Sequence, residues 1–189
     1  MIKKRIAITT LLICLCFQCM AYCVLADNTA DAVEPIVPDR TASLTLSYGY
    51  ADTAFSSLEV DLYRIAEVSF DFQYTLTATF APTGLILNGI QSTGEWNVIR
   101  STLEAYIVAN QLPSDAVCLT KEDGTAAFDN LKTGLYLAVA EKAVQGELSC
   151  DFDSALVALP GLSRDGYWEY QVTANAKGEP THRSSPTPR

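Results

Sequence analysis

Near the end of the chain a lysine follows a run of strand-forming residues, and its amine is a group with chemistry to offer. Residues 166–177 read G-Y-W-E-Y-Q-V-T-A-N-A-K, and a segment containing Gly and Pro follows them. The large aromatic side chains and Val172 predict a strand over residues 167–174, so Lys177 stands where this strand stops. An amine at this position is either a solvated charge or a nucleophile.

Other catalytic chemistry lacks the residues it needs. The single histidine, His182, lies in the tail, so a Ser-His-Asp or Cys-His site is not expected. Beyond residue 26 the sequence has no C-x-x-C, H-E-x-x-H, G-x-G-x-x-G or phosphate-binding loop pattern. Asp151 and Asp153 share one face of a strand, but a calcium loop needs more oxygen ligands and a glycine. We therefore expect no enzyme, no cofactor and no metal site.

The first residues have the pattern of a secretory signal peptide. Basic residues at positions 3–5 precede an apolar run, and the small residues Val24 and Ala26 stand just before Asp27. We expect cleavage after Ala26, which makes residues 1–26 the signal peptide. The alternative is a lipid anchor on Cys23, which the bulky Tyr22 in front of it disfavours. No later apolar run is long enough to span a bilayer.

The charge balance excludes two classes of partner. The formal net charge is −9. The only charged residues among residues 1–26 are basic, so removing this segment makes the net charge of the remaining chain more negative. Nucleic acid requires a basic face, and so does a polybasic contact with an anionic membrane. A strongly acidic chain instead fits a soluble extracellular surface.

Two cysteines, Cys118 and Cys150, remain when the signal peptide is removed. In an oxidising compartment such cysteines usually pair, and the bond would stabilise the fold by roughly 3–4 kcal/mol. The alternative is two buried thiols that pack as small apolar groups. We expect the disulfide, in a structural and not a catalytic role.

The elements that position Lys177 are expected to be mostly strands. Apolar residues alternate in T-A-S-L-T-L-S-Y-G-Y, in L-E-V-D-L-Y-R-I-A-E-V and in Y-T-L-T-A-T-F, and Asp123-Gly124 predicts a tight hairpin. The sequence divides into an extended lead-in at residues 27–40, one folded domain at 41–178 and a disordered tail at 179–189.

One segment has helical spacing instead. Apolar residues recur at helical intervals over residues 94–111, Ser92 and Glu95 match a capping box, and Pro113 marks the end. We expect this helix to cover one face of a sheet, and a partner-binding helix is the alternative. Short strands with frequent turns and one helix predict a mainly β, Ig-like single β-sandwich with an inserted α-helix.

The stretch around Lys177 resembles the pilin motif of Gram-positive sortase-assembled pili, W-x-x-x-V-x-V-Y-P-K. Trp168 matches the Trp, Val172 the first Val, Ala174 the second Val and Lys177 the lysine, whereas residues 175–176 replace the Tyr-Pro pair with Asn-Ala. In that family a sortase joins the lysine amine to the C-terminal threonine of the next subunit. The resemblance therefore implies that Lys177 is a sortase linkage site.

Two further stretches add to this resemblance. L-E-V-D-L-Y-R-I-A-E-V and L-K-T-G-L-Y-L-A-V-A-E look like strands of Cna B-type and SpaA-like domains, and the second ends at Glu141, where the family has its E-box glutamate. The resemblance covers about residues 42–177. It implies a prealbumin-type sandwich, the cell wall or pilus of a Gram-positive bacterium as the location, and a sortase and other pilin subunits as partners.

The sequence also departs from this family. Many such domains contain an internal Lys–Asn isopeptide bond promoted by a buried acid, and here Asn175 would be the acceptor and Glu141 the acid. Tyr48 and Gly49 stand where the lysine would be expected, so we expect no internal isopeptide bond. No L-P-x-T-G sorting signal follows Lys177. The expectation is a truncated product or a fragment of a longer pilin, with a free secreted domain as the alternative.

Two functional hypotheses follow. The first is a secreted cell-surface structural protein, a pilin-like subunit domain linked through Lys177. The alternative is a secreted adhesin-type module that contacts a host or matrix ligand through the helix or its adjoining loops. A large exposed aromatic patch beside the helix would favour the alternative.

Overall fold

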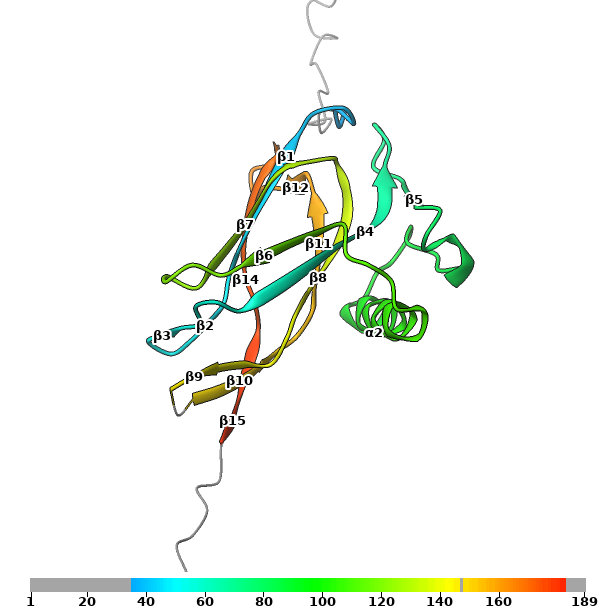
Figure 1. Cartoon of the computed structure of the whole chain (residues 1–189). Coiled ribbons are helices and arrows are strands. Elements are labelled where there is room, and N and C mark those ends of the chain that lie inside the picture. The colour runs from blue at the N-terminus through cyan, green and yellow to red at the C-terminus, as the bar shows by residue number, and fades with distance from the viewer. Residues whose placement is uncertain (1–34, 147, 183–189) are drawn as a thin grey trace, which may run out of the picture. The chain divides into compact units, whose positions relative to one another are not determined.

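The computed structural model describes residues 35–146 and 148–182, and the expected signal peptide lies outside them. Strands predominate in this part of the chain, and two helical elements interrupt them (Figure 1). The helical elements are η1 (Ala81–Thr83) and α2 (Thr93–Asn110). The strands are β1 (Ala42–Ser47), β2 (Gly49–Tyr50), β3 (Thr53–Ala54), β4 (Glu59–Val68), β5 (Tyr74–Leu76), β6 (Ala116–Leu119), β7 (Thr125–Leu131), β8 (Gly134–Ala140), β9 (Ala143–Gln145), β10 (Leu148–Phe152), β11 (Ala155–Leu159), β12 (Gly161–Leu162), β13 (Trp168–Glu169), β14 (Gln171–Asn175) and β15 (Gly178–His182).

Two sheets enclose the main core. One has the strand order β14-β1-β7, and the other has the order β11-β8-β4-β5, with β6 also paired to β4. Leu44 and Leu46 of β1 and Val60 and Leu62 of β4 are buried in the same apolar cluster. Along β1 the buried residues alternate with more exposed ones, because successive side chains of a strand point to opposite faces. Strand β4 also buries Tyr63 and Ile65. The expected mainly β sandwich with an inserted helix is confirmed.

Helix α2 covers the opposite face of the five-stranded sheet. Its buried residues Ile99, Leu103 and Ile107 belong to a second apolar cluster, together with Ile65 of β4 and Leu137 of β8. Strand β4 is therefore buried on both faces, with the sandwich core on one side and the helix on the other. The expectation that the helix covers a sheet is confirmed.

Local chemistry fixes both ends of α2. The Ser92 hydroxyl accepts a hydrogen bond from the Glu95 N–H, and the Glu95 carboxylate accepts one from the Ser92 N–H, which completes the expected capping box. At the C-terminal end Gln111 adopts a left-handed backbone, and its N–H bonds to carbonyl groups of the last turn. Among the described residues no helix is long and apolar enough to cross a membrane.

A tight turn at Asp123-Gly124 joins β6 and β7, but the expected hairpin is wrong, because β6 pairs with β4 and β7 pairs with β1 in the other sheet. Gly124 has a φ of 77°, and a Cβ at this position would lie 2.5 Å from the Tyr48 carbonyl oxygen. Both the left-handed backbone and the close approach require glycine. The Asp123 carboxylate accepts hydrogen bonds from the N–H and the hydroxyl of Thr125, which closes the turn.

The segments before and after the predicted strands are more ordered than expected. Ile36 of the lead-in is buried, and the Val37 N–H donates to the Tyr170 hydroxyl at 2.9 Å. At the other end, the expected disordered tail is wrong for residues 179–182, because β15 pairs antiparallel with β10. The Gly- and Pro-containing sequence of β15 favours no strand locally, so its conformation comes from pairing with a sheet that the rest of the chain builds.

Candidate linkage site

Strand β14 leads the chain to Lys177. It pairs in parallel with β1, with Val172 opposite Leu44 and Ala174 opposite Leu46. Val172 and Ala174 are half-buried and pack against the main core, while the other residues of β14 are exposed. Because β1 is itself a central strand, this pairing ties the stretch before Lys177 to the middle of the sandwich.

Lys177 lies where the chain passes from one sheet to another. The Ala176 N–H donates to the Ser47 carbonyl of β1 at 2.9 Å, and the Lys177 carbonyl accepts from the Asp153 N–H at 2.8 Å, directly after β10. Strand β15 then continues along β10, with Gly178 opposite Phe152. The backbone of Lys177 is thus held from both sides, while its side chain is exposed.

The residue after Lys177 must be small. A Cβ on Gly178 would lie 2.6 Å from the Cys150 sulfur and 2.6 Å from the Cε1 atom of Phe152, both in the buried core. The absence of a side chain therefore lets the backbone lie flat against these two groups. This close contact also fixes the direction in which the chain leaves Lys177.

The charges around Lys177 leave its amine without a counter-ion. Asp151 and Asp153 lie nearby on the paired β10 segment, but Lys142 holds Asp151 at 3.4 Å and Arg100 holds Asp153 at 3.7 Å. Within residues 35–146 and 148–182 no ion pair includes Lys177. An exposed and unpaired amine on a fixed backbone can attack an activated acyl group brought by a partner.

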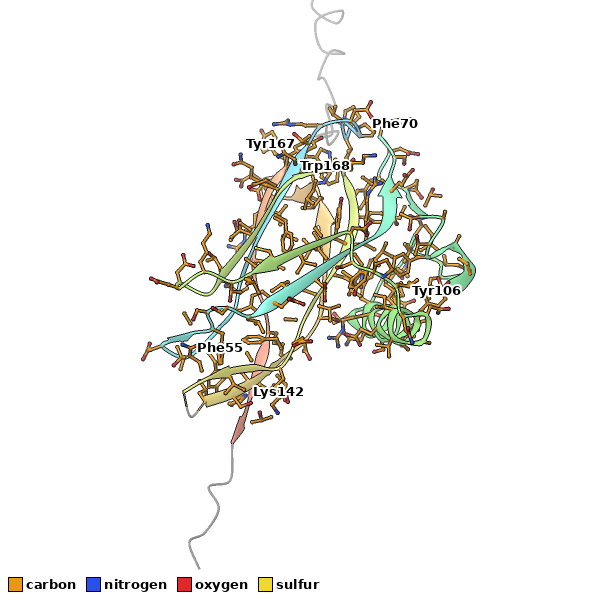
Figure 2. All side chains as sticks on the ribbon, viewed as in Figure 1. Phe55, Phe70, Tyr106, Lys142, Tyr167 and Trp168 are labelled. Atoms are coloured by element: carbon orange, nitrogen blue, oxygen red, sulfur yellow. The ribbon has the colours of Figure 1, made fainter. Side chains whose placement is uncertain are left out.

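Trp168, the first residue of the motif, lies at the other end of β14. It belongs to the short β12–β13 pair, and its half-buried ring stands 5.1 Å from the ring of Phe72, with 32° between their planes. Figure 2 shows Trp168 near Phe70 and Tyr167 at one end of the domain, with Phe55 and Lys142 towards the opposite end. The expected single strand over residues 167–174 is thus divided into β13, which contains Trp168, and β14, which contains Val172 and Ala174, and Lys177 follows β14. The motif is an extended stretch and not a compact pocket.

The groups considered for an internal isopeptide bond are not assembled in the core. Glu141 is exposed after β8, and Asn175 is exposed at the end of β14. Tyr48 fills the core position considered for the lysine, with its ring 5.1 Å from that of Phe152 in an edge-to-face contact. Phe55 contacts the same Phe152 ring at 5.3 Å, so aromatic packing occupies this region.

The expected disulfide is not formed, because Cys118 and Cys150 are both free thiols. Cys118 is half-buried on β6 and Cys150 is fully buried on β10, and both contact the main core. The structure thus has the alternative arrangement, in which each thiol packs as a small apolar group. Sequence cannot separate these cases, since pairing depends on the relative placement of two strands that are distant along the chain.

The described residues contain no group of three or more His, Cys, Asp or Glu side chains placed to hold a metal ion.

A feature that the motifs did not predict is a cavity of about 460 Å³ beside the N-terminus of α2. Three aromatic residues line it, namely Phe72, Tyr74 and Trp96. The local sequence F-D-F-Q-Y at residues 70–74 was a possible signal, because aromatic residues are unusual in a turn.

No family model and no curated protein matches this sequence. The structure is similar to solved pilins, among them the T6 backbone pilin of serotype M6 Streptococcus pyogenes, with a TM-score of 0.49 and 20% identity over 76% of this chain and 29% of that chain. The major pilin SpaD from Corynebacterium diphtheriae has a TM-score of 0.45 and 19% identity over 76% and 31% of the two chains. The major pilin SpaA of the same organism has a TM-score of 0.43 and 21% identity over 73% and 30%.

This chain thus spans about a third of the length of those pilins.

Proposed function

We propose that the chain is a secreted, pilin-like structural domain of a Gram-positive cell surface, with Lys177 as the residue through which a sortase links it to another subunit. One observation carries this proposal: the Lys177 amine is exposed and unpaired at a backbone position that hydrogen bonds hold from two sheets. The stretch that leads to it contains Trp168, Val172 and Ala174 at the spacing of the pilin motif.

The linkage reaction requires only a nucleophile from the domain, because the sortase supplies the activated acyl group. The amine nitrogen attacks the carbonyl carbon of a thioester between the sortase cysteine and the threonine of a second subunit. A C–N bond forms and the C–S bond breaks, while the amine loses a proton and the sortase thiol leaves. The domain therefore has to present a nucleophile and leave room for the enzyme. The exposed side chain of Lys177, between two sheets, meets both requirements.

A transpeptidation assay tests this proposal. The chain is incubated with a pilus-assembling sortase and a sorting-signal peptide, and the products are mapped by tandem mass spectrometry. We expect the peptide on Lys177, and we expect Lys177→Arg to abolish the adduct. Lys142→Arg is the matched control, because Lys142 is exposed directly before β9 yet held by Asp151. An adduct that persists in Lys177→Arg would contradict the proposal.

A second candidate function is a binding module for a host or matrix ligand. The observation that favours it is the aromatic cavity beside α2. In addition, the exposed rings of Phe70 and Tyr167 lie at one end of the domain (Figure 2). Exposed apolar surfaces of this kind often mark interaction sites. Binding of the isolated chain to matrix components, and its loss on substitution of the cavity residues, would test this candidate.

A further inference from the structure

The cavity beside α2 has the dimensions of a small-ligand site. Its volume of about 460 Å³ lies within the range of roughly 300–1,000 Å³ that is usual for ligand pockets. Phe72 and Tyr74 come from the turn before β5 and from β5 itself, Trp96 comes from the first turn of α2, and Leu135 and Leu156 come from β8 and β11. Elements distant along the chain thus meet around one open hollow.

The lining of the cavity is neutral. None of its residues carries a charge, although the chain as a whole has a formal net charge of −9. The Asn88 amide is already used, since it accepts from the Tyr74 N–H at 2.8 Å and donates to the Tyr74 carbonyl at 2.9 Å. The Gln73 amide, the Tyr74 hydroxyl and the Trp96 indole N–H have no partner among the described residues. Aromatic surface and free neutral hydrogen-bonding groups therefore occur together.

Phe72 is held at the rim of the cavity by a strained backbone. Its φ is 61°, a left-handed conformation that is rare for a bulky residue. The turn is closed by bonds from the Phe72 N–H to the Ser69 carbonyl at 3.1 Å and from the Ser69 N–H to the Gln73 carbonyl at 2.9 Å. The ring nevertheless stays 41% exposed, between Tyr74 at 5.3 Å and Trp168 at 5.1 Å. Strain of this kind concentrates at ligand clamps.

Neutral saccharides match this combination of groups. A pyranose ring has an apolar C–H face that can lie on an aromatic ring, and its hydroxyls can pair with uncharged amide, phenol and indole groups. A charged ligand would meet no counter-charge in the lining, and a wholly apolar one would leave the polar groups unpaired. The Tyr74 phenol is a neutral donor at physiological pH, and burial raises its pKa further, to about 12.

We propose that this cavity binds a neutral saccharide, with Phe72 and Trp96 as the stacking surfaces and Gln73 and Tyr74 as hydrogen-bonding groups. The proposal rests on the second candidate function and names its ligand class. It is independent of the linkage at Lys177, which lies at the other end of β14.

The test titrates the full chain with neutral oligosaccharides of glucose, galactose and N-acetylglucosamine, followed by tryptophan fluorescence and calorimetry. We expect saturable binding of at least one of them, with a fluorescence change because Trp96 lines the site and Trp168 contacts Phe72. A parallel titration uses a proline-rich peptide, since such peptides also dock into aromatic-lined grooves. Saturable binding of this peptide alone would support the second candidate function and overturn the saccharide inference.

Phe72→Gly separates binding from folding. Glycine adopts the left-handed backbone without strain, which offsets part of the loss of the ring contacts with Tyr74 and Trp168. We therefore expect the chain to fold, with a loss of saccharide affinity of about ten-fold or more. Phe70→Ala is the matched control, because Phe70 is 66% exposed on the same turn but does not line the cavity. Lys177→Arg should bind as the unmodified chain does.

Failure of every neutral saccharide to bind, or affinity unchanged in both Phe72→Gly and Trp96→Leu, would overturn the inference. Neither result bears on the linkage at Lys177, whose assay reads a different product. Binding of a matrix component that persists without saccharide binding would leave the second candidate function standing.

Discussion

The Asp153 N–H donates a hydrogen bond to the Lys177 carbonyl oxygen at 2.8 Å, and this bond joins the end of the β14 segment to the sheet that contains β10. One residue earlier, Ala176 is still bonded to Ser47 of β1. The position of Lys177 is therefore determined by main-chain contacts, so side-chain changes there should alter chemistry without altering the fold.

The close contact after Lys177 gives the first prediction. We expect Gly178→Ala to lower the free energy of unfolding by about 1–3 kcal/mol, because the added methyl group would overlap Cys150 and Phe152 in a packed core. Urea denaturation measures this change. Gly94→Ala is the control, since the nearest atom to its new Cβ is 3.9 Å away and alanine favours the helix. Equal effects of the two substitutions would contradict the steric explanation.

Packing of α2 on the sheet gives the second prediction. Leu103 is completely buried between the helix and the five-stranded sheet, so we expect Leu103→Ala to lower the free energy of unfolding by about 2–5 kcal/mol. Val108→Ala on the same helix should change it by less than about 0.5 kcal/mol, because Val108 is 77% exposed. A large loss for Val108→Ala would indicate that this outer face of the helix is covered.

The capping box gives a prediction on pH. Hydrogen bonds from the Ser92 hydroxyl and the Gln91 N–H favour the Glu95 carboxylate and lower its pKa below the ordinary value of 4.5. A pKa lowered by folding means that the contribution to stability is present above pH 4.5 and is lost as the pH falls through the folded-state value. Acid titration of unfolding should therefore have a smaller slope below pH 4.5 for Glu95→Gln than for the unmodified chain.

An unchanged slope in Glu95→Gln would show that other carboxyl groups account for the acid sensitivity. Ser92→Ala provides a second readout at neutral pH, where loss of the helix cap should cost about 1 kcal/mol.

The free thiols give a fourth prediction. Burial raises the pKa of Cys150, with a smaller contribution from the charge of Asp151, so this thiol should form little thiolate and react slowly. A thiol reagent should label half-buried Cys118 first in the native protein and Cys150 only after denaturation. Cys118→Ser should remove the faster reaction. If denatured, non-reduced protein takes up no label, the cysteines are paired in solution.

Local sequence was sufficient for the elements whose determinants lie close together in the chain. The helical spacing and the Ser92–Glu95 capping box predicted α2, because the capping partners stand three residues apart. Asp123-Gly124 predicted the turn between β6 and β7, since a tight turn depends on a few adjacent backbone angles, but not that these two strands pair in different sheets. Alternation in β1 and β4 predicted which side chains enter the core, although it could not say that β4 is buried on both faces.

Relations between distant segments depended on the tertiary structure. The parallel pairing of β1 with β14 and the pairing of β10 with β15 join stretches that no local pattern relates, and together they place Lys177 between two sheets. The Phe72–Trp168 contact and the cavity beside it likewise combine separate elements.

The sequence alone determined the mainly β class with its helix, the acidic charge and the position of Lys177 at a strand end. Only the tertiary structure decided that residues 179–182 continue as a strand, that Cys118 and Cys150 stay apart as thiols, and that aromatic rings line a neutral cavity. The physical reason is that strand pairing and side-chain packing bring together groups far apart in the chain, whereas capping and turns depend on near neighbours.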